Sequence, residues 1–98
     1  MKAIDFAVRL TAKLLKYKNE LSLMDAGILF AVAAGLDYAP DIADTLQRPG
    51  GSTVTGLHRL AKAGLIHPTG WTDAGTPLYK LTHDGKLFVF NLLNYREQ

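Results

Sequence analysis

The chain has 98 residues, a formal net charge of +2 and no cysteine. A chain of this length forms one domain, here 1–98, that buries roughly 60–65% of its unfolded surface, and the lack of cysteine excludes disulfides, thiolate zinc sites and cysteine nucleophiles. Charged residues interrupt the apolar start of the chain, and no apolar run reaches the roughly 20 residues that span a bilayer. We therefore expect a cytoplasmic protein without signal peptide or membrane segment.

The first three predicted elements are helices. Apolar residues at spacings of three and four predict a helix over 3–17. Ser22, followed three residues later by Asp25, is a capping-box pattern that predicts the start of a second helix. This helix is apolar on nearly all sides, which predicts a central, buried position, and Gly35 ends it. A short helix with a proline in its first turn follows at 40–47.

The second half of the chain changes from helical to strand-like periodicity. Residues 52–64 predict a fourth helix, with Ser52 as its N-cap and Gly64 directly after its last turn. Short apolar segments at 65–67 and 78–81 predict two strands, and the stretch rich in Gly, Pro, Thr and Asp between them predicts a hairpin loop. A last helix begins at Thr82 or His83. The residues expected to face inward from it are Leu87, Phe88, Leu92 and Tyr95.

A helical wheel divides the fourth helix into an apolar and a polar side. The apolar side holds Val54, Leu57, Leu60, Ala61 and Gly64. The polar side holds Ser52, Thr55, Gly56, Arg59, Lys62 and Ala63, with His58 at the border. This polar side has small residues, hydroxyls and long basic side chains but no acid, which suits a helix in a DNA major groove. The alternative is an ordinary solvated helix face.

Two sequence motifs resemble those of MarR- and PadR-type transcription regulators. Residues 57–66 match L-x-x-L-x-x-x-G-L-I, which in those families ends the recognition helix. Residues 79–85 match Y-x-L-T-x-x-G, which follows the wing, and a wing-sized gap separates the two motifs. The resemblance covers roughly 22–90. It implies a mainly α fold with a small β-hairpin wing (α+β), a winged helix-turn-helix with extra N- and C-terminal helices.

The resemblance implies a DNA-binding transcriptional regulator that places residues 52–63 as a recognition helix in the major groove of double-stranded DNA. The expected DNA-binding residues are Arg48, Ser52, Thr53, Thr55, Gly56, His58, Arg59, Lys62 and Lys80. Ser52, Thr55 and Arg59 read or position bases. Thr53, Lys62, Arg48 and Lys80 hold phosphates, although the wheel turns Thr53 inward.

Glycine in a helix interior costs ~1 kcal/mol relative to alanine, so Gly56 needs a reason. Either a partner backbone approaches it closely or it makes a tight contact within the fold. The wing raises a second open question, because Thr69 to Pro77 has no basic residue and contains Asp73. We expect its Trp71 to pack under the hairpin. The alternative function is a winged-helix protein-protein interaction module that does not bind DNA and uses the neutral wing and Trp71.

The resemblance also implies a homodimer built from the terminal helices, 1–18 and 83–98, around a winged-helix core at 22–82. The composition agrees, because both ends have more apolar residues than a small core can cover. These residues are Phe6, Leu10, Leu14 and Tyr17 at one end, and Phe88, Phe90, Leu93 and Tyr95 at the other. The alternative is that both helices cover the core of one monomer.

The sequence gives no indication of an enzyme. His58, His67 and His83 are scattered without metal-ligand spacing, and no phosphate-binding loop or nucleophile motif is present. We expect no catalytic residue, metal or cofactor, and no pocket for a small-molecule effector can be identified. Basic residues dominate 1–18 and 48–80 while 19–47 carries only acids, an asymmetry that favours an anionic partner or self-association.

Overall fold

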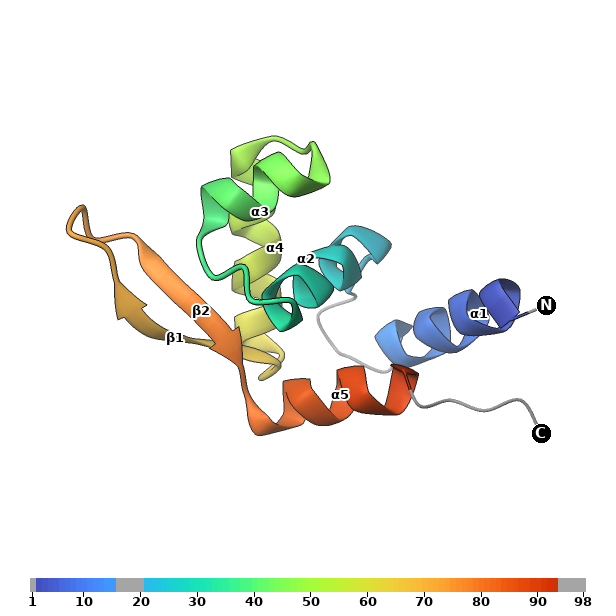
Figure 1. Ribbon diagram of the computed structural model, residues 1–98. Helices are drawn as coiled ribbons and strands as arrows, with labels where there is room; N and C mark the ends of the chain where they lie inside the picture. Colours follow the sequence, from blue (N-terminus) through green and yellow to red (C-terminus); the bar gives the residue numbers. More distant parts are fainter. Residues whose placement is uncertain (1, 16–20, 94–98) are drawn as a thin grey trace.

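The computed structural model describes residues 2–15 and 21–93 (Figure 1). Its elements, in chain order, are α1 Lys2–Leu15, α2 Leu23–Ala33, α3 Ala39–Leu46, α4 Gly50–Lys62, β1 Ile66–Trp71, β2 Pro77–Leu81 and α5 His83–Leu93. Helices α2, α3 and α4 form the centre of the molecule, the hairpin projects to one side, and α1 lies on the other (Figure 1). The mainly α fold with a two-stranded antiparallel hairpin is confirmed.

The start of α2 forms as its sequence predicts. The Ser22 hydroxyl accepts a hydrogen bond from the Asp25 backbone N–H at 3.1 Å, and the Asp25 carboxylate accepts one from the Ser22 N–H at 3.0 Å. This reciprocal capping box satisfies two N–H groups that the helix cannot pair internally. At the other end, Gly35 has φ +104°, where a side chain would be strained, so it stops the helix.

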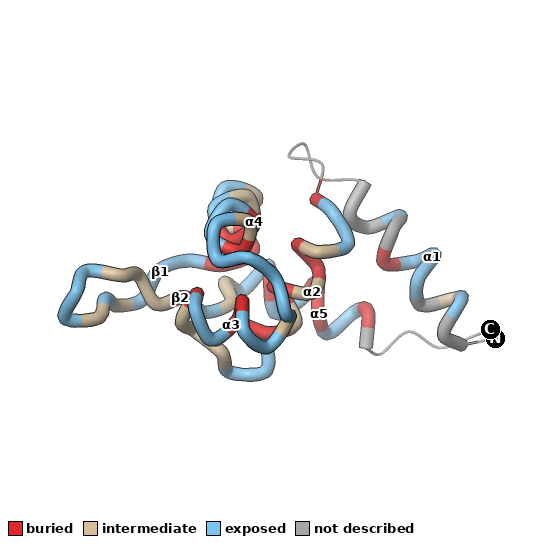
Figure 2. Tube along the Cα trace, turned by 90° about the horizontal axis from the view of Figure 1, so that it is seen from above, coloured by how far each residue is buried: buried red, intermediate tan, exposed pale blue. Residues whose placement is uncertain are grey.

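The core is centred on α2 and α4. Its most deeply buried apolar side chains come from α2, α3, α4 and the segment that follows α4: Ile28, Leu29, Ile42, Leu57, Leu60, Leu65 and Ile66. Burial is concentrated where these helices meet, whereas the far end of the hairpin and most of the described side chains of α1 are exposed (Figure 2). Each end helix adds to the same core, through Leu10 from α1 and Phe88 and Leu92 from α5.

The face of α5 differs in part from the prediction. Phe88 and Leu92 are buried, as expected, but Leu87 is 46% exposed. The prediction for Leu87 is wrong because the core reaches α5 on the side that carries Phe88, Val89 and Leu92. Tyr95 and Tyr17, like the last residues of the predicted first helix, lie outside the described residues.

Helix α4 begins three residues earlier than an N-cap at Ser52 predicts. Gly50 is its first residue and Pro49 its N-cap, so Ser52 lies within the first turn. Ser52 fails to act as the cap because its hydroxyl donates to the Pro49 carbonyl at 3.0 Å and the Thr53 N–H bonds to that carbonyl as well. The end of the helix is as predicted, with Gly64 at φ +81°.

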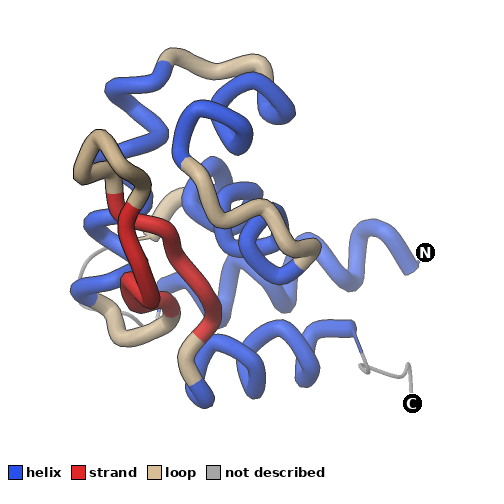
Figure 3. The backbone as a smooth tube through the Cα atoms, turned by 60° about the vertical axis from the view of Figure 1, so that its left-hand side comes forward, coloured by secondary structure: helices blue, strands red, loops and turns tan. Residues whose placement is uncertain are grey.

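The hairpin is longer and its loop shorter than predicted. β1 continues to Trp71 because the register shifts between Pro68 and Gly70, a bulge that keeps the strands paired as far as Trp71 and Pro77. The two strands run side by side as a hairpin (Figure 3). The Thr72 N–H bonds to the Thr76 carbonyl at 2.9 Å and closes the loop. Trp71 is 64% exposed, so its expected packing under the hairpin is wrong.

Thr82 joins the base of the wing to α4 and α5. Its N–H donates to the Leu65 carbonyl at 3.0 Å and its hydroxyl to the Gly64 carbonyl at 2.6 Å. The same hydroxyl accepts from the Gly85 N–H at 3.0 Å and so caps α5. A Cβ at Gly85 would collide with the Leu65 carbonyl oxygen, so only glycine allows this junction to close. The Y-x-L-T-x-x-G pattern is therefore a structural requirement.

Candidate nucleic-acid interface

The exposed side of α4 is displaced from the one that the helical wheel predicts. Thr53, Gly56, Leu57 and Leu60 are buried, and Thr55, His58 and Lys62 are exposed. Val54, expected on the apolar side, is 41% exposed. The difference arises because α2 and α3 both pack on α4, and α2 covers the flank that contains Gly56. The exposed side therefore centres on Thr55, His58 and Lys62.

Gly56 lies against α2, not on the exposed side. A Cβ at this position would be 2.5 Å from Ile28 Cδ1 and 2.8 Å from Asp25 Oδ1, both closer than real contacts allow. The glycine is explained by a tight contact within the fold, so its predicted place among the DNA-contacting residues is wrong. A partner backbone is not needed to account for it.

Arg59 forms an ion pair that the sequence did not reveal. Its Nε–H donates to Asp25 Oδ2 at 2.8 Å and its Nη2–H to Asp25 Oδ1 at 2.9 Å. The carboxyl side chain is fully buried and the arginine side chain is 37% exposed. α4 itself carries no acid, as expected, but α2 supplies one. One edge of the Arg59 guanidinium is therefore bound to Asp25, and only the rest of the group is left for the predicted contact with bases.

The pKa shifts of Asp25 and Arg59 both favour the charged form of the side chain. Burial alone raises the pKa of Asp25, but hydrogen bonds from Arg59 and from the Ser22 N–H outweigh burial and leave the pKa below its usual value. The hydrogen bond to Asp25 raises the pKa of Arg59. The pair is thus a bidentate contact between an anion and a cation, which joins the first turn of α2 to the third turn of α4.

The hydroxyl groups of α4 bond to the helix backbone. Thr53 donates to the Pro49 carbonyl at 3.1 Å and Thr55 to the Gly51 carbonyl at 3.0 Å. Thr53 is fully buried, so the inward direction given by the wheel is right and its side chain cannot reach a phosphate. Thr55 is exposed and Ser52 half-buried, and both hydroxyl oxygens keep acceptor capacity towards DNA.

The wing presents Lys80 beside a residue that sequence analysis missed. Lys80 on β2 pairs in register with His67 on β1, and both are exposed. Residues directly opposite each other on antiparallel strands point to the same face, so these two side chains form one cationic or hydrogen-bonding spot. Only the register of the hairpin shows that His67 lies opposite Lys80. That register cannot be derived from the sequence unless the ends of both strands are known.

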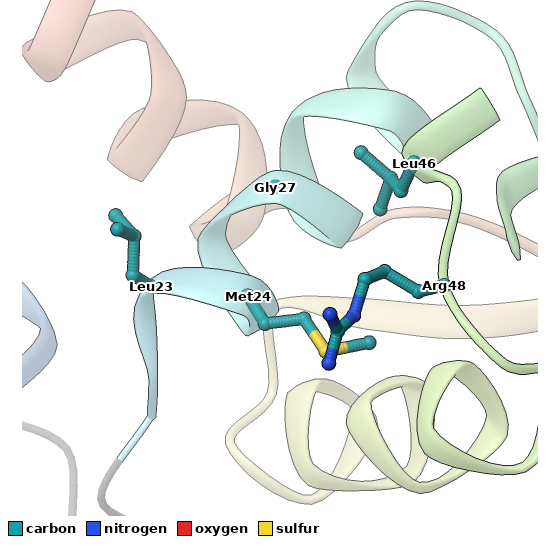
Figure 4. Close-up of a pocket in the computed structure, with 5 residues that line it drawn as sticks. All are labelled: Leu23, Met24, Gly27, Leu46 and Arg48. Carbon is teal, nitrogen blue, oxygen red and sulfur yellow. The ribbon is translucent and has the colours of Figure 1, made fainter.

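Arg48 lies over α2 in the turn between α3 and α4. It lines an open pocket of about 350 Å³ together with Leu23, Met24, Gly27 and Leu46. Its side chain extends towards Met24 (Figure 4). Arg48 precedes α4 and Lys80 lies on the hairpin that follows it, whereas His58 and Lys62 come from α4 itself. Among the residues that the structure describes, no cluster of three metal-binding side chains occurs and no helix could span a membrane.

No protein-family model matches the chain, and no curated protein matches it. A solved structure does: a mutant of S. aureus MepR, a MarR-family winged-helix regulator, with a TM-score of 0.70. The alignment covers 93% of this chain and 67% of that chain, at 21% sequence identity.

The chain has a MarR-like winged-helix fold. In this winged helix, α3 and α4 are the helix-turn-helix and the β1–β2 hairpin is the wing. The two motifs at 57–66 and 79–85 coincide with the end of α4 and with the junction after the wing. They therefore mark the parts of the fold that fix how α4 and the wing sit relative to each other.

Proposed function

We propose that this winged helix is a dimeric transcriptional regulator that binds double-stranded DNA with α4 in the major groove. The observation that carries the proposal is the exposed side of α4, which combines Thr55, His58 and Lys62 and has no acid. The helix lies where winged-helix proteins present their recognition helix. The likeness to a known regulator supports the same function.

The side chains divide into two roles. Thr55, His58 and Ser52 are assigned to base edges, since hydroxyl and imidazole groups both donate and accept hydrogen bonds. Lys62 at the end of α4 and Lys80 on the wing are suited to phosphates, because an ammonium on a long stem binds as a point charge. Arg48, in the turn before α4, offers a third cation.

The charge around α4 predicts weak electrostatic binding. Asp41 and Asp44 on α3 are exposed, and the wing loop carries Asp73 and no basic residue. Few phosphates can then be neutralised per protomer, so the slope of log K against log salt should be shallow, with each phosphate contact adding about 0.9. Specific base contacts and dimerisation must supply the rest of the affinity.

The dimer is proposed on an apolar surface formed by α1 and α5. These helices contact each other; α1 lies on the side of the molecule away from the wing, and α5 runs from the base of the wing towards α1 (Figure 1). Their exposed apolar residues are Ile4, Val8, Leu87 and Phe90. Large apolar side chains that remain exposed on adjacent helices are typical of an interface. The buried Leu10 and Phe88, first expected at this surface, belong to the monomer core.

The test is an amide-shift NMR titration with a mixed-sequence DNA duplex at low and moderate salt. We expect shifts at residues 48–62 and around Lys80 that fade as salt rises. Lys62→Gln should weaken binding, and the matched control Lys86→Gln, on α5, should not. If no amide moves at low salt, DNA binding is refuted, and a protein partner for the exposed Trp71 becomes the next candidate.

A further inference from the structure

We propose that Arg59 binds a DNA phosphate through the guanidinium edge that does not contact Asp25, and that Asp25 is the positioning residue that holds the guanidinium in place. This inference rests on the proposed DNA-binding function and adds a specific contact to it. It also gives a second role to Asp25, whose carboxylate already caps the start of α2.

The hydrogen-bond geometry leaves one edge of Arg59 available. A guanidinium has five N–H donors in one plane. Asp25 accepts one hydrogen from Nε and one from Nη2. Two hydrogens on Nη1 and the second one on Nη2 remain, and the last of these runs parallel to one Nη1–H. This end-on pair matches two oxygens of one phosphate, the bidentate geometry that distinguishes arginine from lysine.

The position of Arg59 on α4 fits this contact. It follows Thr55 by four residues and precedes Lys62 by three, so all three are neighbours on one helix surface. Its side chain is 37% exposed, intermediate between the buried flank at Gly56 and the open side. Arg59 thus lies along the edge of the proposed DNA-facing side, where the sugar-phosphate backbone flanks a helix in the major groove.

The support behind Arg59 is rigid. Asp25 is fully buried and its carboxylate also accepts the Ser22 N–H at 3.0 Å, so it has little freedom to turn. An arginine fixed in this way loses less conformational entropy when it binds than a freely rotating one does. The pair is also electrically neutral. Asp25 would therefore oppose DNA binding if charge alone counted, and would favour it if orientation counts more.

An effect of charge alone and a positioning role of Asp25 predict opposite changes in DNA affinity for Asp25→Asn. Removal of a negative charge strengthens DNA binding if only charge matters. If Asp25 positions Arg59, the same variant weakens binding roughly tenfold, the effect of one charge-assisted hydrogen bond. The control Asp84→Asn, at an exposed site on α5, changes the net charge equally and should leave the affinity unchanged or slightly higher. Affinity is measured by fluorescence anisotropy with a labelled duplex.

Arg59 itself is tested through the salt dependence of binding. Arg59→Gln should reduce the slope of log K against log salt by about 0.9, the value for one phosphate contact, whereas Lys86→Gln should not change it. Arg59→Lys keeps the charge but cannot hold Asp25 and a phosphate with one planar group, so it should bind more weakly than wild type. Each variant is assayed below its melting temperature, as monitored by circular dichroism.

The outcomes separate the two proposals. If wild type does not bind DNA, the proposed function fails. If wild type binds but Asp25→Asn binds more tightly, or Arg59→Gln keeps the full salt slope, the positioning role is refuted and the ion pair only stabilises the contact between α2 and α4. A loss of affinity in Asp25→Asn together with a reduced slope in Arg59→Gln supports the inference.

Discussion

Replacement of Gly56 by alanine tests how closely α2 and α4 approach each other. The new methyl group would lie 2.5 Å from Ile28 Cδ1 and 2.8 Å from Asp25 Oδ1. Neither atom can yield easily, because Ile28 is fully buried and Asp25 is held by Arg59 and Ser22. Overpacking of this kind destabilises by about 1–3 kcal/mol. Alanine normally gains ~1 kcal/mol over glycine in a helix, so the expected net loss of stability is at most about 2 kcal/mol.

The measurement is the melting temperature of Gly56→Ala and of a matched control, followed by circular dichroism. A change of 1 kcal/mol shifts the melting temperature of a 60–100-residue domain by roughly 4–8 °C, so a net loss of this size is easily resolved. Gly27→Ala is the control, because it lies inside α2 and a Cβ there meets Leu46 Cδ2 at an ordinary 3.7 Å. We expect Gly27→Ala to be neutral or stabilising. An equal gain in Gly56→Ala would refute the close approach of the two helices.

The ion pair, the wing and the base of the wing each give one further prediction. Because the folded-state pKa of Asp25 is lowered, its stabilisation is fully present above the unfolded pKa and is lost as pH falls through the folded pKa; the difference in unfolding free energy between wild type and Asp25→Asn should therefore shrink on acidification, and a constant difference from pH 7 to pH 3 would contradict this. Trp71→Ala should change stability by no more than about 0.5 kcal/mol in urea unfolding, because the side chain is exposed, and a larger loss would mean that the ring is packed. Thr82→Val should destabilise by about 1 kcal/mol, since it removes the α5 cap and the hydrogen bond to Gly64, whereas Thr82→Ser should retain most of the stability.

Local signals in the sequence predicted most of the fold. The capping box at Ser22 and Asp25 and the glycines at 35 and 64 act through a few neighbouring residues, and the structure has them as predicted. The start of α4 was missed because proline served as its N-cap without any side-chain hydrogen bond. The serine that looked like the cap donates its hydroxyl back to that proline instead.

The candidate site was less predictable, because it depends on contacts between distant segments. The helical wheel gives angles within α4 but not the direction from which α2 approaches, and that direction decides that Gly56 is buried. Asp25 and Arg59 are 34 residues apart, so no local pattern connects them. The predicted packing of Trp71 is wrong because β1, lengthened by its bulge, continues to the end of the hairpin, away from the core.

The junction at Thr82 ties three segments together at a single point. The end of α4, the base of the wing and the start of α5 meet through Gly64, Leu65 and Gly85, and no side chain fits between Gly85 and the Leu65 carbonyl. A rotation of α5 about its first turn would therefore be expected to displace the end of α4. In the proposed dimer, α5 would connect the dimer surface to the recognition helix, so a small change in the angle between two protomers would alter the distance between their recognition helices.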